Sequence, residues 1–228
     1  MQIRAIDVAQ LASPADVIFD ALKEAITLGT LVEGAVLRQE SIAKMFNVSR
    51  IPVREAFTRL EEQGLIVTQR YRGAVVASLS FEEIEEIFEF RALIEPEVIR
   101  HSVENISSES LEIAAEYSAR FSASTDPKQW GDLNRLFHYS LYRDCGRPYY
   151  LQIAEASLNR IERYQRAQLT LTAGMDRARS EHDGILQACM RRDADAAAER
   201  TREHIRGAER SLISFLKRAR GTEQAAQM

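Results

Sequence analysis

The fold of this chain is decided by residues 39–60, which read QESIAKMFNVSRIPVREAFTRL. Apolar residues recur at helical spacing on both sides of Asn47-Val48-Ser49, so the stretch predicts two short helices, 39–46 and 50–63. Asn tolerates the left-handed conformation that often ends a helix, and Ser is a favoured N-cap. Two short helices joined by such a turn have the length and spacing of a helix-turn-helix.

The second of these helices carries arginines away from its apolar stripe, which consists of Val53, Ala56, Phe57 and Leu60. Arg50 lies in the first turn and Arg54 one turn later. The partial positive charge of a helix N-terminus favours phosphate, and the planar fork of Arg suits the O6 and N7 atoms of guanine. Ser49, Arg50 and Arg54 are therefore candidate DNA contacts. The alternative is a small helical domain whose arginines are only solvated.

The elements around this motif complete a small domain. Ser13-Pro14 predicts the start of a preceding helix. Residues 65–67 and 74–77 are β-prone runs, and they form the only convincing hairpin in the sequence. Arg72 and Gly73 lie in its turn, where they could reach a DNA groove. Residues 36–75 hold seven basic and four acidic side chains, a net charge of +3 against −4 for the whole chain.

Residues 37–67, LRQESIAKMFNVSRIPVREAFTRLEEQGLIV, resemble the winged helix-turn-helix of the GntR family of bacterial transcription regulators. The resemblance covers about residues 14–78, and residues 48–56 are its most specific part. It implies that Ser49, Arg50 and Arg54 contact DNA and that Gly73 sits at the tip of the wing. The family usually has Gly where this chain has Asn47, which suits the same turn. Some members carry a DNA-contacting Arg where this chain has Glu40, so no role is carried over to Glu40.

The rest of the chain predicts helices only. Ser80 and Glu83 form a capping box that opens the second half. The predicted helices lie near 81–103, 108–123, 127–144, 148–170, 176–191 and 194–218, and Pro96 is expected to kink or split the first of them. The sequence thus predicts a mainly α protein. It has a DNA-binding domain over residues 1–79 and a helical domain over residues 80–220.

Three of the four histidines are candidates for one metal site. Asn134 and His138 are four residues apart and share a helix face. His182 lies 10 residues before Arg192 and His204 lies 12 after it, so a helical hairpin that turns there puts the two imidazoles at heights about 3 Å apart. Neutral imidazole suits Zn, Ni, Fe or Mn. The alternative is that the histidines are separate surface or core residues.

Residues 81–215 are similar to the FCD effector domain of the FadR subfamily, in the run DLNRLFHYSLY from Asp132 and around Glu181-His182 and His204. The resemblance implies a helical bundle that holds a divalent metal (Zn, Ni or Mn) through Asn134, His138, His182 and His204. Many members have Asp in place of this Asn. It also implies that residues 80–220 form a dimerisation domain that binds a small organic-acid effector, whose carboxylate completes the metal shell. Arg91 is a candidate partner for that anion deep in the bundle, and its rival role is a surface ion pair with Glu95.

Whole-chain properties agree with these predictions. The 228 residues carry a net charge of −4, 45% are hydrophobic, and the two cysteines predict buried thiols in a reducing compartment. The sequence shows no signal-peptide stretch and no apolar run of about 18 residues, which predicts a cytoplasmic protein without a membrane partner. Together with these properties, the two family resemblances imply a homodimeric regulator, a repressor and not an enzyme, that binds a double-stranded operator. An all-α metalloenzyme and a metal-free bundle are the alternatives.

Overall fold

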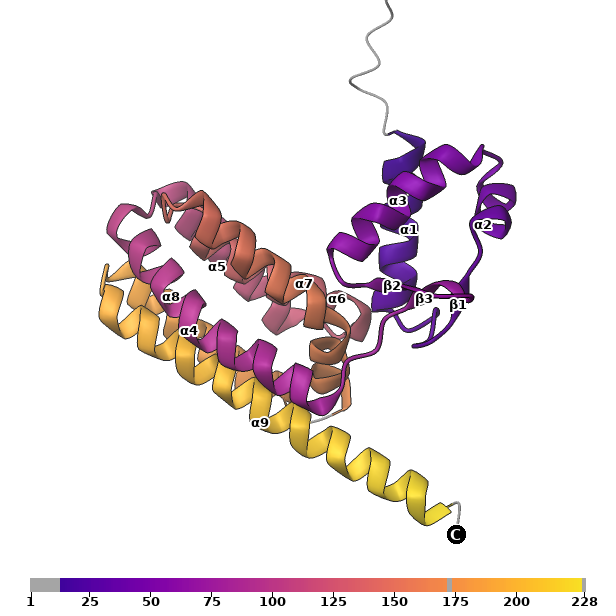
Figure 1. The fold of residues 1–228 in the computed structure, drawn as a ribbon. Helices are drawn as coiled ribbons and strands as arrows, with labels where there is room; N and C mark the ends of the chain where they lie inside the picture. The colour runs from indigo at the N-terminus through magenta and orange to yellow at the C-terminus, as the bar shows by residue number, and fades with distance from the viewer. Residues whose placement is uncertain (1–12, 172–173, 227–228) are drawn as a thin grey trace, which may run out of the picture. The chain divides into compact units, whose positions relative to one another are not determined.

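The computed structural model describes residues 13–171 and 174–226, and it divides into two compact units between Ser78 and Leu79. Figure 1 shows the ribbon of both units. Within the described part of the chain, no helix is both long and apolar enough to cross a bilayer.

The first unit is a small helical domain with a short sheet. Its elements are α1 (Pro14–Thr27), β1 (Val36–Leu37), α2 (Gln39–Phe46), α3 (Arg50–Glu62), β2 (Ile66–Gln69) and β3 (Gly73–Val76). The predicted start of α1 is confirmed, because Ser13 and Asp16 form a reciprocal capping box. The predicted end of α2 is confirmed as well, since Asn47 adopts the left-handed conformation with φ of 52°.

The sheet has three strands rather than the two of a lone hairpin. β1 pairs antiparallel with β3, with Val36 opposite Val75, and the strand order is β1-β3-β2. The prediction of a hairpin alone was therefore incomplete. Two residues are too few to show a β period, so only the pairing with β3 identifies this strand.

Packing of the first unit turns Arg50 and Arg54 of α3 outward. Val53 and Leu60 are fully buried in the core that α1, α2 and α3 share. Arg50 and Arg54, which lie off that buried stripe, are exposed. The apolar pattern thus fixes which face of α3 meets solvent.

The second unit is a helical bundle. Its helices are α4 (Phe81–Asn105), α5 (Ser108–Ala123), α6 (Pro127–Tyr142), α7 (Pro148–Leu171), α8 (Gly174–Met190) and α9 (Ala194–Ala226). The predicted capping box of Ser80 and Glu83 starts α4. α4 packs along α9, and Figure 1 shows the yellow end of α9 continuing past the helices beside it.

Pro96 does not split α4, which runs as one helix from Phe81 to Asn105. Proline inside a helix costs about 3 kcal/mol, because it removes one backbone hydrogen bond and crowds the preceding turn. Here Pro96, Val98 and Ile99 are all buried. The burial of this stretch offsets the local cost, so the predicted split was wrong.

The two cysteines are buried and free, as predicted. Burial also raises the pKa of Cys189 to about 12, so that this thiol stays protonated. A protonated buried thiol is a poor nucleophile. Both cysteines therefore act as small core residues of the second unit.

Candidate nucleic-acid interface and candidate metal centre

The N-terminus of α3 is an exposed, positively charged helix start. Ser49 is its N-cap, yet the Ser49 side chain makes no capping hydrogen bond, and the first turn contains no acidic residue. Ser49, Arg50 and Arg54 are all exposed. Free backbone N–H groups and two guanidinium groups thus lie at one end of one helix, which is the arrangement that binds phosphate.

Arg50 has a partner that sequence analysis did not assign. Its Nη2 donates to Oε1 of Glu40, which lies in the first turn of α2. The side chains of Arg50 and Glu40 are 65% and 75% exposed, so the ion pair lies at the surface. The two residues are ten positions apart on different helices, and no local spacing rule brings such a pair together.

The turn between β2 and β3 presents the other predicted contacts. Arg72 and Gly73 are exposed, and Gly73 begins β3 opposite Gln69 with φ of 78°. Tyr71, which was not singled out from the sequence, is 92% exposed and also has a positive φ, of 69°. The Arg70 guanidinium lies 5.2 Å from the centroid of its ring. The turn therefore offers cations and one open aromatic face.

In the second unit, three histidines from three helices meet in the interior. His138 comes from α6, His182 from α8 and His204 from α9, and all are buried. One ligand atom from each lies within 4.8 Å of the others. The separation of His182 and His204 about the turn at Arg192 predicts this meeting, because it aligns their heights in a helical hairpin.

Hydrogen bonds at the outer nitrogens orient two of the rings. Nδ1 of His204 lies 2.7 Å from Oε2 of Glu181 and donates to it. The hydroxyl of Tyr142 donates to Oε2 of Glu95 at 2.8 Å, so it accepts from Nδ1 of His138 at 3.4 Å. The Nε2 atoms of the two imidazoles face each other at 3.2 Å, and the tautomers of the rings decide which of them donates.

The third ring, of His182, has no hydrogen-bond partner for either nitrogen among the described residues. It packs against Phe137 and Phe121, with ring centroids 4.3 and 4.8 Å away. Burial lowers the pKa of His182 well below its usual value, and the neighbouring His204 lowers it further.

Burial lowers the pKa of His138 in the same way, and the charges of His204, His182 and Arg91 add to the effect. Neutral imidazoles are the form that ligates metal, and unpartnered buried nitrogens are costly without one. The donor set therefore fits a transition metal.

Residues that support these rings went unassigned in the sequence. Metal-bound histidines commonly donate their second N–H to a carboxylate or another outer partner, the position that Glu181 and Tyr142 occupy here. Tyr142 lies four residues after His138, and that spacing could have indicated it. Glu181 lies 23 residues from His204, and only the packing of α8 on α9 joins them.

Asn134, the fourth predicted ligand, is buried on α6. It lines a small cavity together with His204, Gln165 and Arg177, whereas His138 and His182 are not among the residues that line it. Its role as a ligand stays a prediction.

Arg91, the predicted effector partner, is buried in the bundle, as predicted. Its Nε donates to Oε1 of Glu95 at 2.5 Å, and Nη2 to Oε2 at 3.4 Å. The alternative, a surface ion pair between Arg91 and Glu95, was right about the partner. It was wrong about the location, because both side chains are at most 1% exposed. Nη1 of Arg91 has no hydrogen-bond partner among the described residues.

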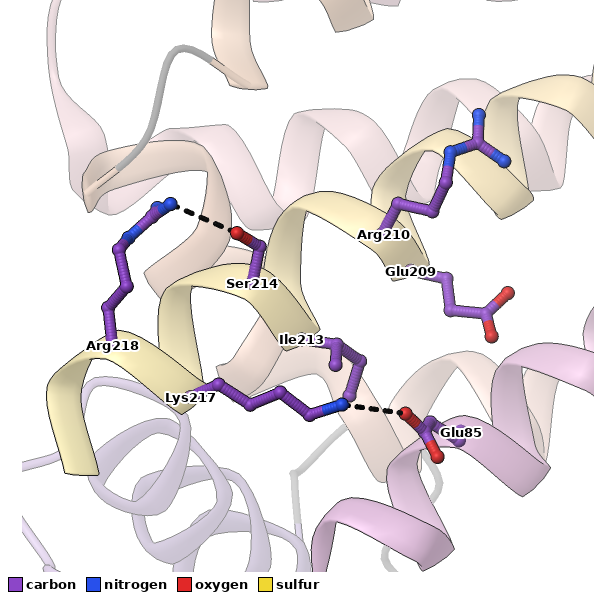
Figure 2. Close-up of a pocket in the computed structure, with 7 residues that line it drawn as sticks. All are labelled: Glu85, Glu209, Arg210, Ile213, Ser214, Lys217 and Arg218. Carbon is purple, nitrogen blue, oxygen red and sulfur yellow. Dashed lines mark hydrogen bonds and ion pairs between the residues drawn. The ribbon is translucent and has the colours of Figure 1, made fainter. Parts of the chain in front are cut away.

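A surface pocket of about 500 Å³ lies elsewhere on this unit, between α4 and α9. Figure 2 shows its mixed charge, with Lys217 paired to Glu85 and Arg218 bonded to Ser214. None of the three clustered histidines lines it. Solvated ion pairs of this kind are ordinary on helical surfaces.

Comparison with known families gives two matches that together span most of the chain. Residues 14–76 match the model of the bacterial regulatory proteins of the gntR family, and residues 86–207 match that of the FCD domain. The first match covers the exposed α3 N-terminus, and the second covers the histidine cluster.

Individual relatives agree with these matches. The chain is 27% identical over 216 residues to BphR, an uncharacterized HTH-type transcriptional regulator of Paraburkholderia xenovorans. The aligned region covers 88% of the chain and 85% of that protein. It is 24% identical to the transcriptional repressor GlaR of Escherichia coli, over 81% of the chain and 89% of that protein.

Solved structures agree as well. The crystal structure of a GntR family regulator from Pseudomonas syringae is 30% identical over 94% of this chain and 89% of its own, with a TM-score of 0.55. The Escherichia coli protein McbR/YncC shares the fold with a TM-score of 0.78 at 21% identity, over 90% of this chain and 100% of its own.

Proposed function

The chain belongs to the gntR family of bacterial regulators and carries an FCD domain, and from this premise we propose that it is a homodimeric repressor controlled by a small organic acid. The matched families and relatives are transcription regulators, not enzymes, so the metalloenzyme alternative is set aside. The resemblance of residues 81–215 to FadR-type FCD domains supports placing it in the FadR subfamily. In this proposal, the first unit binds DNA and the second unit binds the effector.

The observation that carries the DNA-binding part is the exposed start of α3, with Arg50 and Arg54 one helical turn apart. We propose that this end of α3 enters the major groove and that Ser49 meets a phosphate. Arg72 and Gly73 of the β2–β3 turn are proposed to lie along the adjacent minor groove. In a homodimer, two such units read half-sites about one helical turn of DNA apart.

Replacing Arg50 or Arg54 by alanine is expected to weaken operator binding by about 1–3 kcal/mol each, or roughly 5- to 150-fold, because each variant loses a bidentate base contact. Binding is measured at one fixed salt concentration with a duplex that the wild-type protein selects from a random pool. Arg120→Ala, an exposed charge removal on α5, is the matched control and should bind normally. Unchanged binding by both α3 variants would contradict the proposal.

In the helical unit, we propose that His138, His182, His204 and Asn134 hold a divalent metal such as Zn, Ni or Mn. The meeting of the three imidazoles in the interior, with one ligand atom from each within 4.8 Å of the others, supports this donor set. When bound, such a metal supplies a Lewis-acidic centre for the carboxylate of an effector. The native metal is the one that purified protein retains.

The chain supplies its own anion partner beside the cluster. Arg91 is close enough for its charge to lower the pKa of His138, and its Nη1 has no hydrogen-bond partner among the residues that the structure describes. We propose that this nitrogen donates to the carboxylate of the effector, while Nε and Nη2 remain on Glu95. The effector acts on DNA binding only through different affinities for the DNA-competent and DNA-incompetent dimers.

A small dicarboxylate or hydroxy acid at 100 times its Kd is expected to stabilise the metal-loaded protein by about 2.7 kcal/mol. The same acid should shift the metal-free protein much less, because one of its two anchors is then missing. A thermal-shift screen of organic acids, run with and without chelator, makes this comparison. An acid that stabilises both forms equally would place the effector away from the metal.

A further inference from the structure

We infer that Glu40 is a specificity-determining residue of the DNA-binding surface, because its ion pair with Arg50 disfavours contacts of Arg50 with DNA of arbitrary sequence. The inference rests on the proposed contact of Arg50 with DNA. It starts from the ion pair between Nη2 of Arg50 and Oε1 of Glu40. Glu40 lies in the first turn of α2 and Arg50 in the first turn of α3, so the pair bridges the two helices of the helix-turn-helix.

The position of the pair gives it a role in binding rather than in folding. Both side chains are at least 65% exposed, and surface ion pairs contribute little to stability. At the start of α3, however, the carboxylate faces the same approaching phosphates as the guanidinium. A duplex that meets this surface must either draw Arg50 away from Glu40 or accept a carboxylate near its backbone. Both choices cost electrostatic free energy.

This cost falls unequally on different DNA sequences. DNA of arbitrary sequence offers Arg50 mainly the negative charge of its phosphates. In the free protein, the carboxylate of Glu40 already gives Arg50 a negatively charged partner. A guanine in register offers two acceptors at once, and a single guanidinium can engage both. Glu40 therefore penalises non-cognate complexes more than cognate ones, and it raises the specificity ratio at the expense of total affinity.

The test measures binding of the full-length protein to a duplex of mixed sequence at several salt concentrations between about 50 and 200 mM. The variant Glu40→Gln keeps the shape of the side chain and removes its charge. We expect it to tighten binding roughly 3- to 10-fold at the low-salt end. The slope of log affinity against log salt should steepen by about 0.9, the value of one added phosphate contact. Affinity for the selected operator should rise less.

Two further variants show whether Glu40 acts through Arg50. In an Arg50→Ala background, Glu40→Gln should change both the affinity and the salt slope clearly less, because no cation remains to be released and only the repulsion between carboxylate and phosphate is removed. Glu55→Gln removes an exposed carboxylate elsewhere on α3 and is the matched control for charge alone. It should not steepen the slope by a full contact.

Each other outcome decides against the inference. An unchanged slope in Glu40→Gln, an equal effect in the Arg50→Ala background, or an equal effect of Glu55→Gln would overturn the role of Glu40 as a restraint on Arg50. Failure of the proposed function is distinct from all three, since Arg50→Ala alone would then bind operator as wild type does. Thermal unfolding confirms that each variant is folded.

Discussion

Replacing Glu95 by alanine is expected to lower the free energy of unfolding of the helical unit by about 3–5 kcal/mol, the cost of leaving one member of a buried ion pair uncompensated. Glu95 is 0% and Arg91 1% exposed, so water cannot solvate the guanidinium that remains. The variant also removes the acceptor of the Tyr142 hydroxyl, a second buried polar group. No other single substitution proposed for this unit leaves a buried charge behind.

Urea unfolding followed by tryptophan fluorescence measures this loss. Trp130 is the only tryptophan of the chain and lies on α6, so its signal reports the helical unit rather than the DNA-binding unit. Glu86→Ala removes an exposed carboxylate of the same helix and should change stability by less than about 0.5 kcal/mol.

A double variant separates the charge from the packing. Arg91→Met combined with Glu95→Leu removes both charges and keeps apolar volume, so it should recover most of the lost stability. If Glu95→Ala is no more destabilising than Glu86→Ala, Arg91 must gain solvent or another partner when Glu95 is removed. The buried pair would then contribute little to the stability of the bundle.

Replacing His182 by leucine is expected to affect the metal-free and metal-loaded proteins in opposite directions. In the metal-free protein, leucine removes two buried nitrogens that have no partner in the described part of the chain, and their desolvation costs about 1–3 kcal/mol. It also loses ring packing worth about 0.5–1.5 kcal/mol. The variant should therefore be as stable as the wild type or slightly more stable.

With metal present, the wild type should become the more stable protein. Metal at 1,000 times its Kd stabilises a folded site by about 4.1 kcal/mol, and a variant that lacks one of three imidazoles should lose most of that gain. Thermal unfolding with chelator, and then with Zn, Ni or Mn, reveals the reversal. His101→Leu is the control, because His101 lies outside the cluster, beside Tyr150.

Two results would contradict this prediction. Equal stabilisation of wild type and His182→Leu by every metal would show that the cluster binds none of them through His182. A metal-free variant much less stable than the wild type would show that the nitrogens of His182 do have partners in solution.

Local sequence signals were sufficient for most helix boundaries. Ser13 and Ser80 begin helices where their capping boxes predict, and Asn47 ends α2 in the left-handed conformation. Such signals work because a cap or a turn depends on residues within four positions of each other, and those residues meet whatever the rest of the chain does.

The sequence also predicted that the three histidines lie together. In a helical hairpin, the number of residues between a side chain and the turn gives the position of that side chain along the helix axis, and these numbers are similar for His182 and His204. The sequence could not identify the groups that support the histidines. Glu181 reaches His204 only because α8 packs against α9, and Glu95 reaches Tyr142 only because α4 lies beside α6.

By itself, then, the sequence determined the order of the elements, the outward face of α3 and the clustering of three histidines. Tertiary structure alone decided that β1 joins the sheet, that α4 continues through Pro96, that the Arg91–Glu95 pair is buried, and that Glu40 meets Arg50. The physical reason is range. Caps and periodicity act within a few residues along the backbone, whereas desolvation and contacts between helices depend on which surfaces the folded chain brings together.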